Sequence, residues 1–288
     1  MKVKKGFGEV LFDVVNITLL MVISLVMLYP FWHELCLSLS SSAQATRGGL
    51  FLAPREPTTA AYTQVMKNPF IWTTYANSIF CAVATTAIGV LLTAMLAYGL
   101  SKRQVLGNKA LSFLVVFCMI FQGGMIPTYL TVKSLNLIDS LWALILLAIV
   151  TPYNTIIMKN FFSGMPNDPE EAAAIDGAGP LRIFFQIMLP LAKAVLATVG
   201  LWLAVASWNN FQGPLIYINS RSNLTLPLYI RQVIDGQLIA RTTGEVSKSA
   251  VESVVGATII VSLVPILCVY PFLQKYFVKG VMIGSVKG

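Results

Sequence analysis

The stretch SIFCAVATTAIGVLLTAMLAYGL, residues 78–100, decides the class of fold. It is apolar almost throughout and contains no acidic, basic or histidine residue. An α-helix needs about 20 such residues to cross the hydrocarbon core of a bilayer. Because lipid offers no hydrogen-bond partners to open backbone groups, the stretch is predicted to form a transmembrane helix.

Further stretches share this character along the chain. They are residues 14–32, 111–130, 141–158, 191–208 and 253–272. The sequence therefore predicts an all-α membrane protein whose six transmembrane helices form one domain over residues 1–288. The composition agrees, since 56% of the residues are hydrophobic and 11% are charged, against about 25% charged in soluble domains. Proline is expected to interrupt the fourth helix at Pro152 and the sixth at Pro265.

The first apolar stretch follows three lysines, as a secretory signal would. At residues 14–32 it is longer than the core of a signal, which is about 7–15 residues. The small-residue sequence Ala43-Gln44-Ala45 lies well beyond its end. We therefore expect an uncleaved transmembrane helix.

The distribution of lysine and arginine predicts the orientation in the membrane. With the N-terminus inside, twelve of the 20 basic residues fall in inner segments. The other eight fall in outer segments, seven of them in two long loops whose charge has little influence on insertion. Both termini are therefore predicted to be cytoplasmic, with a long inner loop at 159–190 and a long outer loop at 209–252.

Several functions are excluded by residues that the chain lacks. The basic residues occur singly or in pairs, so the net charge of +8 does not form a nucleic-acid surface. His33-Glu34 resembles the start of a zinc-protease motif, but Leu37 stands where the second histidine belongs, and the chain has one histidine. There is no phosphate-binding loop. The four cysteines form no CxxC pair, so neither a disulfide framework nor a zinc site is expected.

The inner loop contains the most informative polar sequence, NDPEEAAAIDGAGPLRIFFQIMLP, residues 167–190. Asp168 is suited to an N-cap, and Glu171 stands three residues later, as in a capping box. Gly177 is predicted to end this short helix in the left-handed conformation. Pro180 can begin a second helix along the membrane interface, and Pro190 is expected to break it before the fifth span. Its apolar residues recur at helical spacing: Ile183, Phe184, Ile187 and Met188.

This loop resembles the signature loop of binding-protein-dependent ABC permeases. The pattern Glu-Ala-Ala, three residues, Gly, nine residues, Ile, one residue, Leu-Pro is matched at each fixed position. The matching residues are Glu171, Ala172, Ala173, Gly177, Ile187, Leu189 and Pro190. The whole chain resembles the carbohydrate branch typified by maltose importers. The stretch TPYNTIIMKNFFSGMPNDPEEAAAIDGAG is most similar to permeases for oligosaccharides, including uronate-containing ones such as alginate fragments.

The resemblance implies a mechanical role and no chemistry of the chain's own. Residues 169–176 would be the coupling helix that docks into a cytoplasmic ATPase subunit. Glu171 would either pair with a basic residue of the ATPase or cap its own helix. The docking residues implied are Glu171, Ala172, Ala173, Asp176, Gly177, Ile187, Leu189 and Pro190. ATP would be bound by the partner subunits, and no cofactor is expected.

The resemblance also implies the partners. These are a second permease chain of related sequence, two ATPase subunits and an extracytoplasmic solute-binding protein that delivers a sugar or oligosaccharide. The outer loop 209–252 would contact the binding protein. The assembly would lie in the bacterial cytoplasmic membrane.

Two other functions are compatible with the sequence. An ABC permease for another solute class is one, and an ion-coupled secondary transporter is another. Secondary transporters usually place ionisable residues deep within spans, whereas the middles of these stretches have none. Polar residues of the spans either face a cavity or bridge helices, and they leave the substrate site unknown. They are Asn77, Thr85, Thr86, Gln122, Asn154 and Asn209.

Overall fold

The computed structural model describes residues 6–102, 104–243 and 252–285, and its regular structure there is helical. The chain divides into two compact units. Unit 1 comprises Met1–Pro69 and Ile230–Pro265, and unit 2 comprises Phe70–Tyr229 and Ile266–Gly288. Some basic residues used to predict the orientation lie outside the described residues: Lys2, Lys4, Lys5, Arg103, Lys248 and Lys287.

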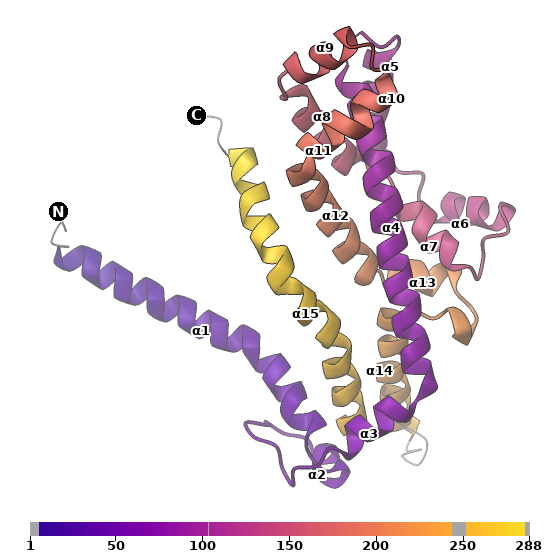
Figure 1. The fold of residues 1–288 in the computed structure, drawn as a ribbon. Helices are drawn as coiled ribbons and strands as arrows, with labels where there is room; N and C mark the ends of the chain where they lie inside the picture. The colour runs from indigo at the N-terminus through magenta and orange to yellow at the C-terminus, as the bar shows by residue number, and fades with distance from the viewer. Residues whose placement is uncertain (1–5, 103, 244–251, 286–288) are drawn as a thin grey trace. The chain divides into compact units, whose positions relative to one another are not determined.

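Unit 1 begins with the long helix α1 (Phe7–Ser38), followed by α2 (Ser42–Thr46) and α3 (Ala60–Lys67) (Figure 1). Its other parts come from α14 (Leu226–Thr243) and α15 (Glu252–Ser285). The apolar side chains of α1 are exposed over most of its length, as expected of a helix solvated by lipid. Only its last turn is buried, in a small cluster of Cys36, Leu37, Ala45 and Phe51.

Helices α1 and α15 approach each other closely within unit 1. A methyl group built on Gly256 would lie 3.1 Å from the backbone oxygen of Glu34. A small residue at this position lets the two backbones come together, as is common between membrane helices.

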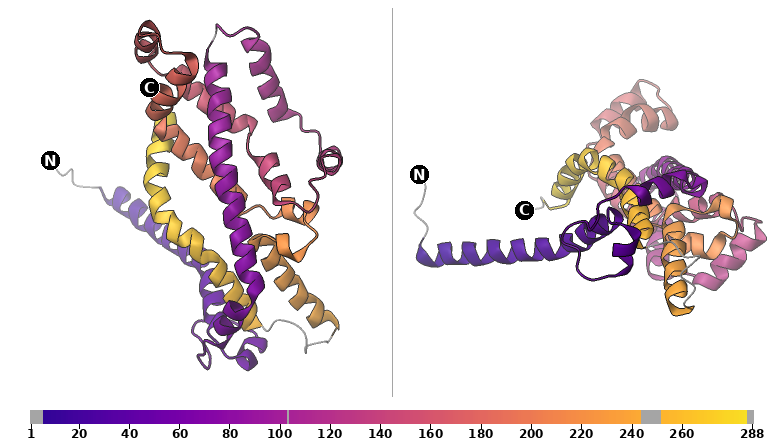
Figure 2. Two further views of the ribbon diagram at one scale, coloured as in Figure 1. Left: turned by 45° about the vertical axis from the view of Figure 1, so that its right-hand side comes forward. Right: turned by 90° about the horizontal axis from the view of Figure 1, so that it is seen from below.

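Unit 2 contains the remaining helices (Figures 1 and 2). In chain order they are α4 (Pro69–Ser101), α5 (Asn108–Ile120), α6 (Met125–Ser134), α7 (Leu141–Ala148), α8 (Pro152–Ser163), α9 (Asp168–Ile175), α10 (Pro180–Ile183), a π-helical turn (Phe184–Met188), α11 (Leu189–Leu191), α12 (Lys193–Trp208), α13 (Gln212–Tyr217), a 3₁₀ turn (Arg221–Asn223), the start of α14 and the end of α15.

Helix α4 is the element around which unit 2 packs. A methyl group on its Gly89 would lie 2.6 Å from the backbone oxygen of Ile149, between α7 and α8. One on Gly200 of α12 would lie 3.3 Å from Val90 of α4. The Thr93 hydroxyl donates to the same Ile149 oxygen at 3.4 Å. Glycine at these crossings allows the close backbone approach, and the hydroxyl satisfies a carbonyl freed by the α7–α8 break.

Two clusters of buried side chains lie along α4. The first joins Ala94 and Ala97 of α4 to α8, α12 and the segment after α9. The second joins Cys81 of α4 to α6, α7, α13 and the chain up to Leu228. The two clusters therefore lie at different heights on one continuous helix.

The expected unbroken helix over 111–130 is wrong. The chain ends α5 at Ile120 and starts α6 at Met125, and the two helices are bent by 114°. Gly124 has φ +84°, a conformation that few other residues adopt without strain. Apolar composition predicted the helices but not the turn that separates them.

Two further spans are bent. The break expected at Pro152 is confirmed, because α7 and α8 meet at 43° and Pro152 starts α8. The chain preceding α12 is bent by 81° from it at Ala192. The break expected at Pro265 is wrong, since α15 continues through it.

In the described residues, α1 and α4 are long and apolar enough to cross a membrane, and up to five spans result if each bent pair is counted as one. The sixth expected span, residues 253–272, lies within α15, whose apolar part Glu252–Cys268 is shorter. The protein is an all-α membrane protein with up to five candidate spans.

Candidate functional site

The short helix α9 forms where the sequence predicts a helix, but its N-cap is not the residue predicted. Its N-cap is Asn167, so Asp168 is the first helical residue and the expected capping box from Asp168 to Glu171 is wrong. The Asn167 backbone oxygen instead accepts from the amides of Glu170 and Glu171 at 2.9 and 3.0 Å. The acidic first turn lies at the positive end of the helix dipole.

The end of α9 is a Schellman motif built on Gly177. The Ala178 amide donates to the Ala173 oxygen at 2.9 Å, and the Gly177 amide donates to the Ala174 oxygen at 3.1 Å. Gly177 has φ +81°, which confirms the predicted left-handed conformation. Both Ala173 and Ala178 pack on the buried cluster of unit 2, so the end of α9 is held against the core.

The chain after α9 is anchored in the core rather than broken at Pro190. Ile183, Phe184 and Met188 are buried. Pro190 has no amide hydrogen for the carbonyl four residues earlier, and the chain takes a π-helical turn directly before it. The expected break therefore occurs two residues later, at Ala192.

Glu170, which the sequence analysis did not single out, fastens α9 to the C-terminal end of α4. Its Oε1 accepts from the Tyr98 hydroxyl at 2.8 Å, and its Oε2 accepts from Lys102 Nζ. Lys102 Nζ lies 4.9 Å from the centre of the Tyr98 ring. That ring packs on Phe162 and Phe184, with centroids 5.6 and 5.2 Å away. We call Tyr98, Lys102 and Glu170 the Glu170 cluster.

The expected docking residues divide between two environments. Glu171, Ala172, Asp176, Gly177 and Pro190 are exposed, whereas Ala173, Ile187 and Leu189 are half-buried and pack on the core of unit 2. Sequence reasoning missed two exposed apolar residues of this segment, Ile175 at 87% and Leu181 at 67% exposure. Large apolar side chains this exposed on a polar loop were a usable signal for a contact surface.

The N-terminal end of α4 forms hydrogen bonds to the segment that follows α13. Asn77 Nδ2 donates to the backbone oxygens of Ser222 and Leu224 at 2.7 and 2.9 Å. Ser78 Oγ accepts from the Leu226 amide at 2.8 Å in a buried position. The sequence left open whether Asn77 lines a cavity, and the structure shows that it bridges two segments.

Asp139, between α6 and α7, forms further hydrogen bonds to the same segment. Its Oδ1 accepts from the amides of Ser220 and Asn219 at 2.9 and 3.0 Å. Its backbone oxygen accepts from Asn223 Nδ2 at 2.6 Å. These hydrogen bonds, led by that from the Ser220 amide, hold the pKa of Asp139 below its usual range.

The remaining polar span residues lie in different environments. Asn154 is buried, Gln122 is exposed, and Asn209 Nδ2 donates to an oxygen of its own helix. Within the described residues Thr85 and Thr86 have buried hydroxyls with no hydrogen-bond partner. Thr86 borders a groove of about 530 Å³ between α4 and α12 whose lining is otherwise apolar.

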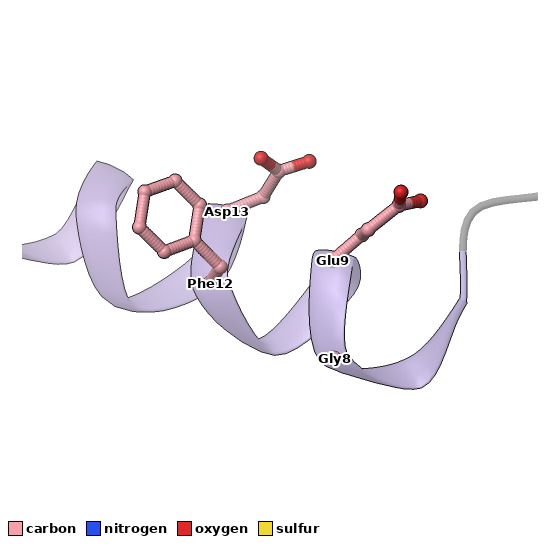
Figure 3. Close-up of a pocket in the computed structure, with 4 residues that line it drawn as sticks. All are labelled: Gly8, Glu9, Phe12 and Asp13. Atoms are coloured by element: carbon pink, nitrogen blue, oxygen red, sulfur yellow. The ribbon is translucent and has the colours of Figure 1, made fainter.

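A second hollow lies beside the first turns of α1, where Figure 3 shows Gly8, Glu9, Phe12 and Asp13. All four residues come from one helix, and Glu9 accepts from the Gly6 amide at 3.1 Å as part of the helix start. Across the described ranges, no three His, Cys, Asp or Glu side chains are grouped so as to hold a metal ion. Among the described residues, the two features relevant to function are therefore the hydrogen-bonded attachments of α9 and of residues 219–226 to α4.

Residues 89–283 match the family described as "Binding-protein-dependent transport system inner membrane component". The chain belongs to this family of ABC importer permeases. As a permease it is a multi-pass inner-membrane transport subunit and not an enzyme. Membership also implies ATPase and binding-protein partners.

Curated relatives cover nearly the whole permease. It is 43% identical over 280 residues to Protein LplC of Bacillus subtilis (strain 168), covering 96% of this chain and 95% of LplC. It is 38% identical over 284 residues to the polygalacturonan/rhamnogalacturonan transport system permease protein YtcP of the same organism, covering 96% and 99%.

A solved structure has the same fold as the permease. Its title is "Crystal structure of a bacterial ABC transporter involved in the import of the acidic polysaccharide alginate". The TM-score is 0.87 at 32% identity, covering 96% of this chain and 100% of the other.

Proposed function

We propose that this permease translocates an oligosaccharide containing uronic acid residues. Support comes from relatives whose names state such cargo, since YtcP is named for polygalacturonan and the similar structure for alginate. A relative at 29% identity over 275 residues, AraQ of Bacillus subtilis (strain 168), is named for arabinooligosaccharides, so a neutral oligosaccharide is the nearest competing substrate.

The substrate can be identified from the affinity of the binding protein, because the binding protein delivers the solute to the permease. We expect the cognate binding protein to bind oligogalacturonides or alginate oligosaccharides at least tenfold more tightly than neutral arabino-oligosaccharides, which is about 1.4 kcal/mol. Calorimetric titration measures this directly. Tight binding of an amino acid without any sugar binding would overturn the proposal.

In the proposed assembly the permease has six spans and both termini in the cytoplasm. Its second permease chain is related in sequence, and two ATPase subunits complete the complex. The observation that carries the topology is the placement of the two long loops on α4. Segment 159–190 is attached through Glu170 at the C-terminal end of α4, and segment 209–252 through Asn77 at its N-terminal end. Since α4 is long enough to cross the bilayer, opposite ends correspond to opposite sides.

Helix α9 is the proposed coupling helix, and its exposed face is the proposed contact with the ATPase. Ile175 and Leu181 would fill an apolar pocket, and Glu171 would offer a carboxylate at the rim of that contact. Exposed apolar surface rimmed by polar residues is typical of protein–protein contact sites. Ala172 permits close approach, while Ala173 packs inward and supports the helix.

Substitution of the anchor tests this surface. Ile175→Asp should reduce the ATPase recovered with the affinity-purified permease at least tenfold, because a charge would enter the apolar contact. Asn160→Asp, at an exposed position of α8, is the matched control and should leave recovery unchanged. Full recovery of ATPase by Ile175→Asp would exclude α9 as the docking element.

A further inference from the structure

We propose that α4 is a rigid link between the segment 219–226 and the coupling helix α9, and that Glu170 is the positioning residue that fastens α9 to it. A displacement of one segment would then reach the other through a single helix. The inference rests on the proposed docking role of α9 and adds the element that moves it.

The attachment at α9 consists of charged and aromatic groups. The Lys102 and Glu170 side chains are 27% and 22% exposed, so the ion pair is largely withdrawn from solvent. A carboxylate that accepts from both an ammonium and a phenol forms charge-assisted hydrogen bonds, which are stronger than neutral ones. Because Tyr98 is held by Phe162 and Phe184, the cluster resists rotation of α9 on α4.

The C-terminal end of α4 is itself fixed. Asn108 Nδ2 donates to the backbone oxygens of Leu100 and Lys102 at 2.9 and 2.8 Å. Ser112 of α5 accepts from Lys159 Nζ of α8 at 2.8 Å. The last turn of α4, α5 and α8 thus form one connected polar network beside α9.

The attachment at the other end uses backbone groups of the partner segment. Asn77 and Ser78 engage the oxygens of Ser222 and Leu224 and the amide of Leu226. Such contacts fix the path of the main chain whatever the side chains do. Asp139 adds two amide contacts from the α6–α7 connection, so the segment cannot shift without moving the helices of unit 2.

Helix α4 suits a rigid link because it is unbroken. It runs from Pro69 to Ser101, whereas α5 and α6 are bent by 114°, α7 and α8 by 43°, and α12 is bent by 81° from the helices before it. From Asn77 to Tyr98 a straight helix rises about 32 Å, the thickness of the hydrocarbon core. A rigid helix that is attached at both ends passes a displacement from one end to the other, because it has no flexible joint that would absorb the displacement.

The coupling between the two segments must act equally in both directions, because it is an equilibrium free energy. If a binding protein seated on the outer segment shifts α4, ATPase closure at α9 must shift the outer segment by the same coupling free energy. Loosening the Glu170 cluster should therefore weaken stimulation of the ATPase by the binding protein more than it weakens assembly.

A charge swap tests this in the complete complex reconstituted in nanodiscs. The measured quantity is the ratio of ATPase rate with binding protein and oligogalacturonide to the rate without them. Glu170→Lys should bring the ratio close to one while the ATPase still co-purifies. Lys102→Glu should do the same, and the double variant should regain at least half of the wild-type ratio. A wild-type ratio in Glu170→Lys would overturn the proposal, as would a double variant no better than the singles.

The neighbouring glutamate is the matched control. Glu171→Lys makes the same charge change on the exposed face, and we expect it to reduce recovery of the ATPase. An equal loss of stimulation ratio in fully assembled Glu170→Lys and Glu171→Lys complexes would also contradict a specific role for Glu170.

A covalent link gives a second test that does not depend on the charge swap. Tyr98→Cys combined with Glu170→Cys, in a chain whose exposed Cys118 and Cys268 are serine, is treated with a short bis-thiol cross-linker. Stimulation should be low before cross-linking and restored after it, because a rigid link requires no motion between α9 and α4. If cross-linking leaves stimulation low in the assembled complex, α9 must move on α4 and the proposal is wrong.

Failure of this inference can be told from failure of the proposed function. If wild-type permease recovers no ATPase subunits, or Ile175→Asp recovers them fully, the docking role of α9 fails. If docking holds and Glu170→Lys keeps its stimulation ratio, only the rigid link fails.

Discussion

Two adjacent glutamates lie in different environments because one helical step turns the side chain by about 100°. Glu170 faces α4 and is bound by Tyr98 and Lys102, whereas Glu171 is exposed. The sequence singled out Glu171 because it belongs to a recognisable pattern. Which of two neighbouring acids faces the core depends on the placement of α9 against α4, and this is a tertiary property.

Substitution of Gly177 should strain the end of α9. A methyl group there meets open space, so the cost comes only from φ +81°. Gly177→Val should destabilise the local fold by about 1–3 kcal/mol, and ATPase association and transport should fall together while membrane insertion persists. Gly179→Ala is the matched control, since Gly179 has φ −71° and open space around it. The measurements are ATPase recovery and vesicle uptake, and wild-type transport in Gly177→Val would remove the requirement for this turn.

Asp139 should make the mobility of residues 219–226 depend on pH. Its pKa is lowered from an ordinary 3.8 by the amides of Ser220 and Asn219, so its stabilising effect is complete above the unfolded pKa. It is lost as the pH falls through the lower folded value. A nitroxide label at Arg221→Cys should be immobile at pH 7 and more mobile at a pH well below 3.8, where Asp139 is protonated.

Asp139→Asn removes this dependence. Asparagine tolerates the observed φ of +61° and keeps one acceptor oxygen, but it has no charge to titrate. The label should therefore have the same mobility at both pH values. An acid-induced change that persists in Asp139→Asn would assign the pH dependence to another group.

At the scale of elements, the apolar stretches predicted where helices form, and the bend at Pro152 was predicted while that between α5 and α6 was not. A bend of 114° between α5 and α6 depends on the backbone conformation of Gly124, and a 3.6-residue pattern carries no information about it. Pro152 was readable because proline lacks an amide hydrogen and favours the first turn of a helix. Pro265 was misleading, since membrane helices accommodate proline when neighbours satisfy the freed carbonyl.

The crossing of α4 with the α7–α8 break should be intolerant of even one methyl group. Gly89→Ala would place Cβ 2.6 Å from the Ile149 oxygen and 2.9 Å from Leu203 Cδ1. Because a backbone atom must move, we expect a loss of about 1–3 kcal/mol, as for other overpacked sites. Gly99→Ala in the same helix is the control, because no atom lies within 4 Å of its added methyl group.

Thermal unfolding in detergent measures the difference between these two glycine variants. The melting temperature of Gly89→Ala should fall, and that of Gly99→Ala should stay the same or rise, since alanine favours helix over glycine by about 1 kcal/mol. Equal melting temperatures would show that the α4 crossing relaxes without cost.

At the scale of the whole molecule, the family and the all-helical membrane class were readable from the sequence. The spacing from Glu171 to Pro190 is fixed by a shared loop structure, and lipid imposes apolar helices. The Glu170 cluster and the Asp139 contacts were not readable, because they join residues about 70 to 80 positions apart, such as Tyr98 with Glu170. The cargo was readable only by resemblance, because the sequence does not fix the rotation of each helix and hence which side chains face the transport pathway.

The proposed topology can be tested by labelling introduced cysteines from each side of the membrane. Labels at glycines with positive φ would strain the chain, so exposed positions with ordinary backbone are preferable. Leu106→Cys, at 97% exposure, and Gly179→Cys should react only when the cytoplasmic side is open to a membrane-impermeant maleimide. Arg221→Cys should react from outside. The exposed Cys118 and Cys268 are replaced by serine beforehand so that labelling reports the introduced thiol alone.

Because Leu106 follows the C-terminal end of α4 and Arg221 lies beside its N-terminal end at Asn77, the two labels must report opposite sides if α4 crosses the bilayer. Reaction of Gly179→Cys from outside in intact cells would overturn both the cytoplasmic placement of α9 and its docking to an ATPase.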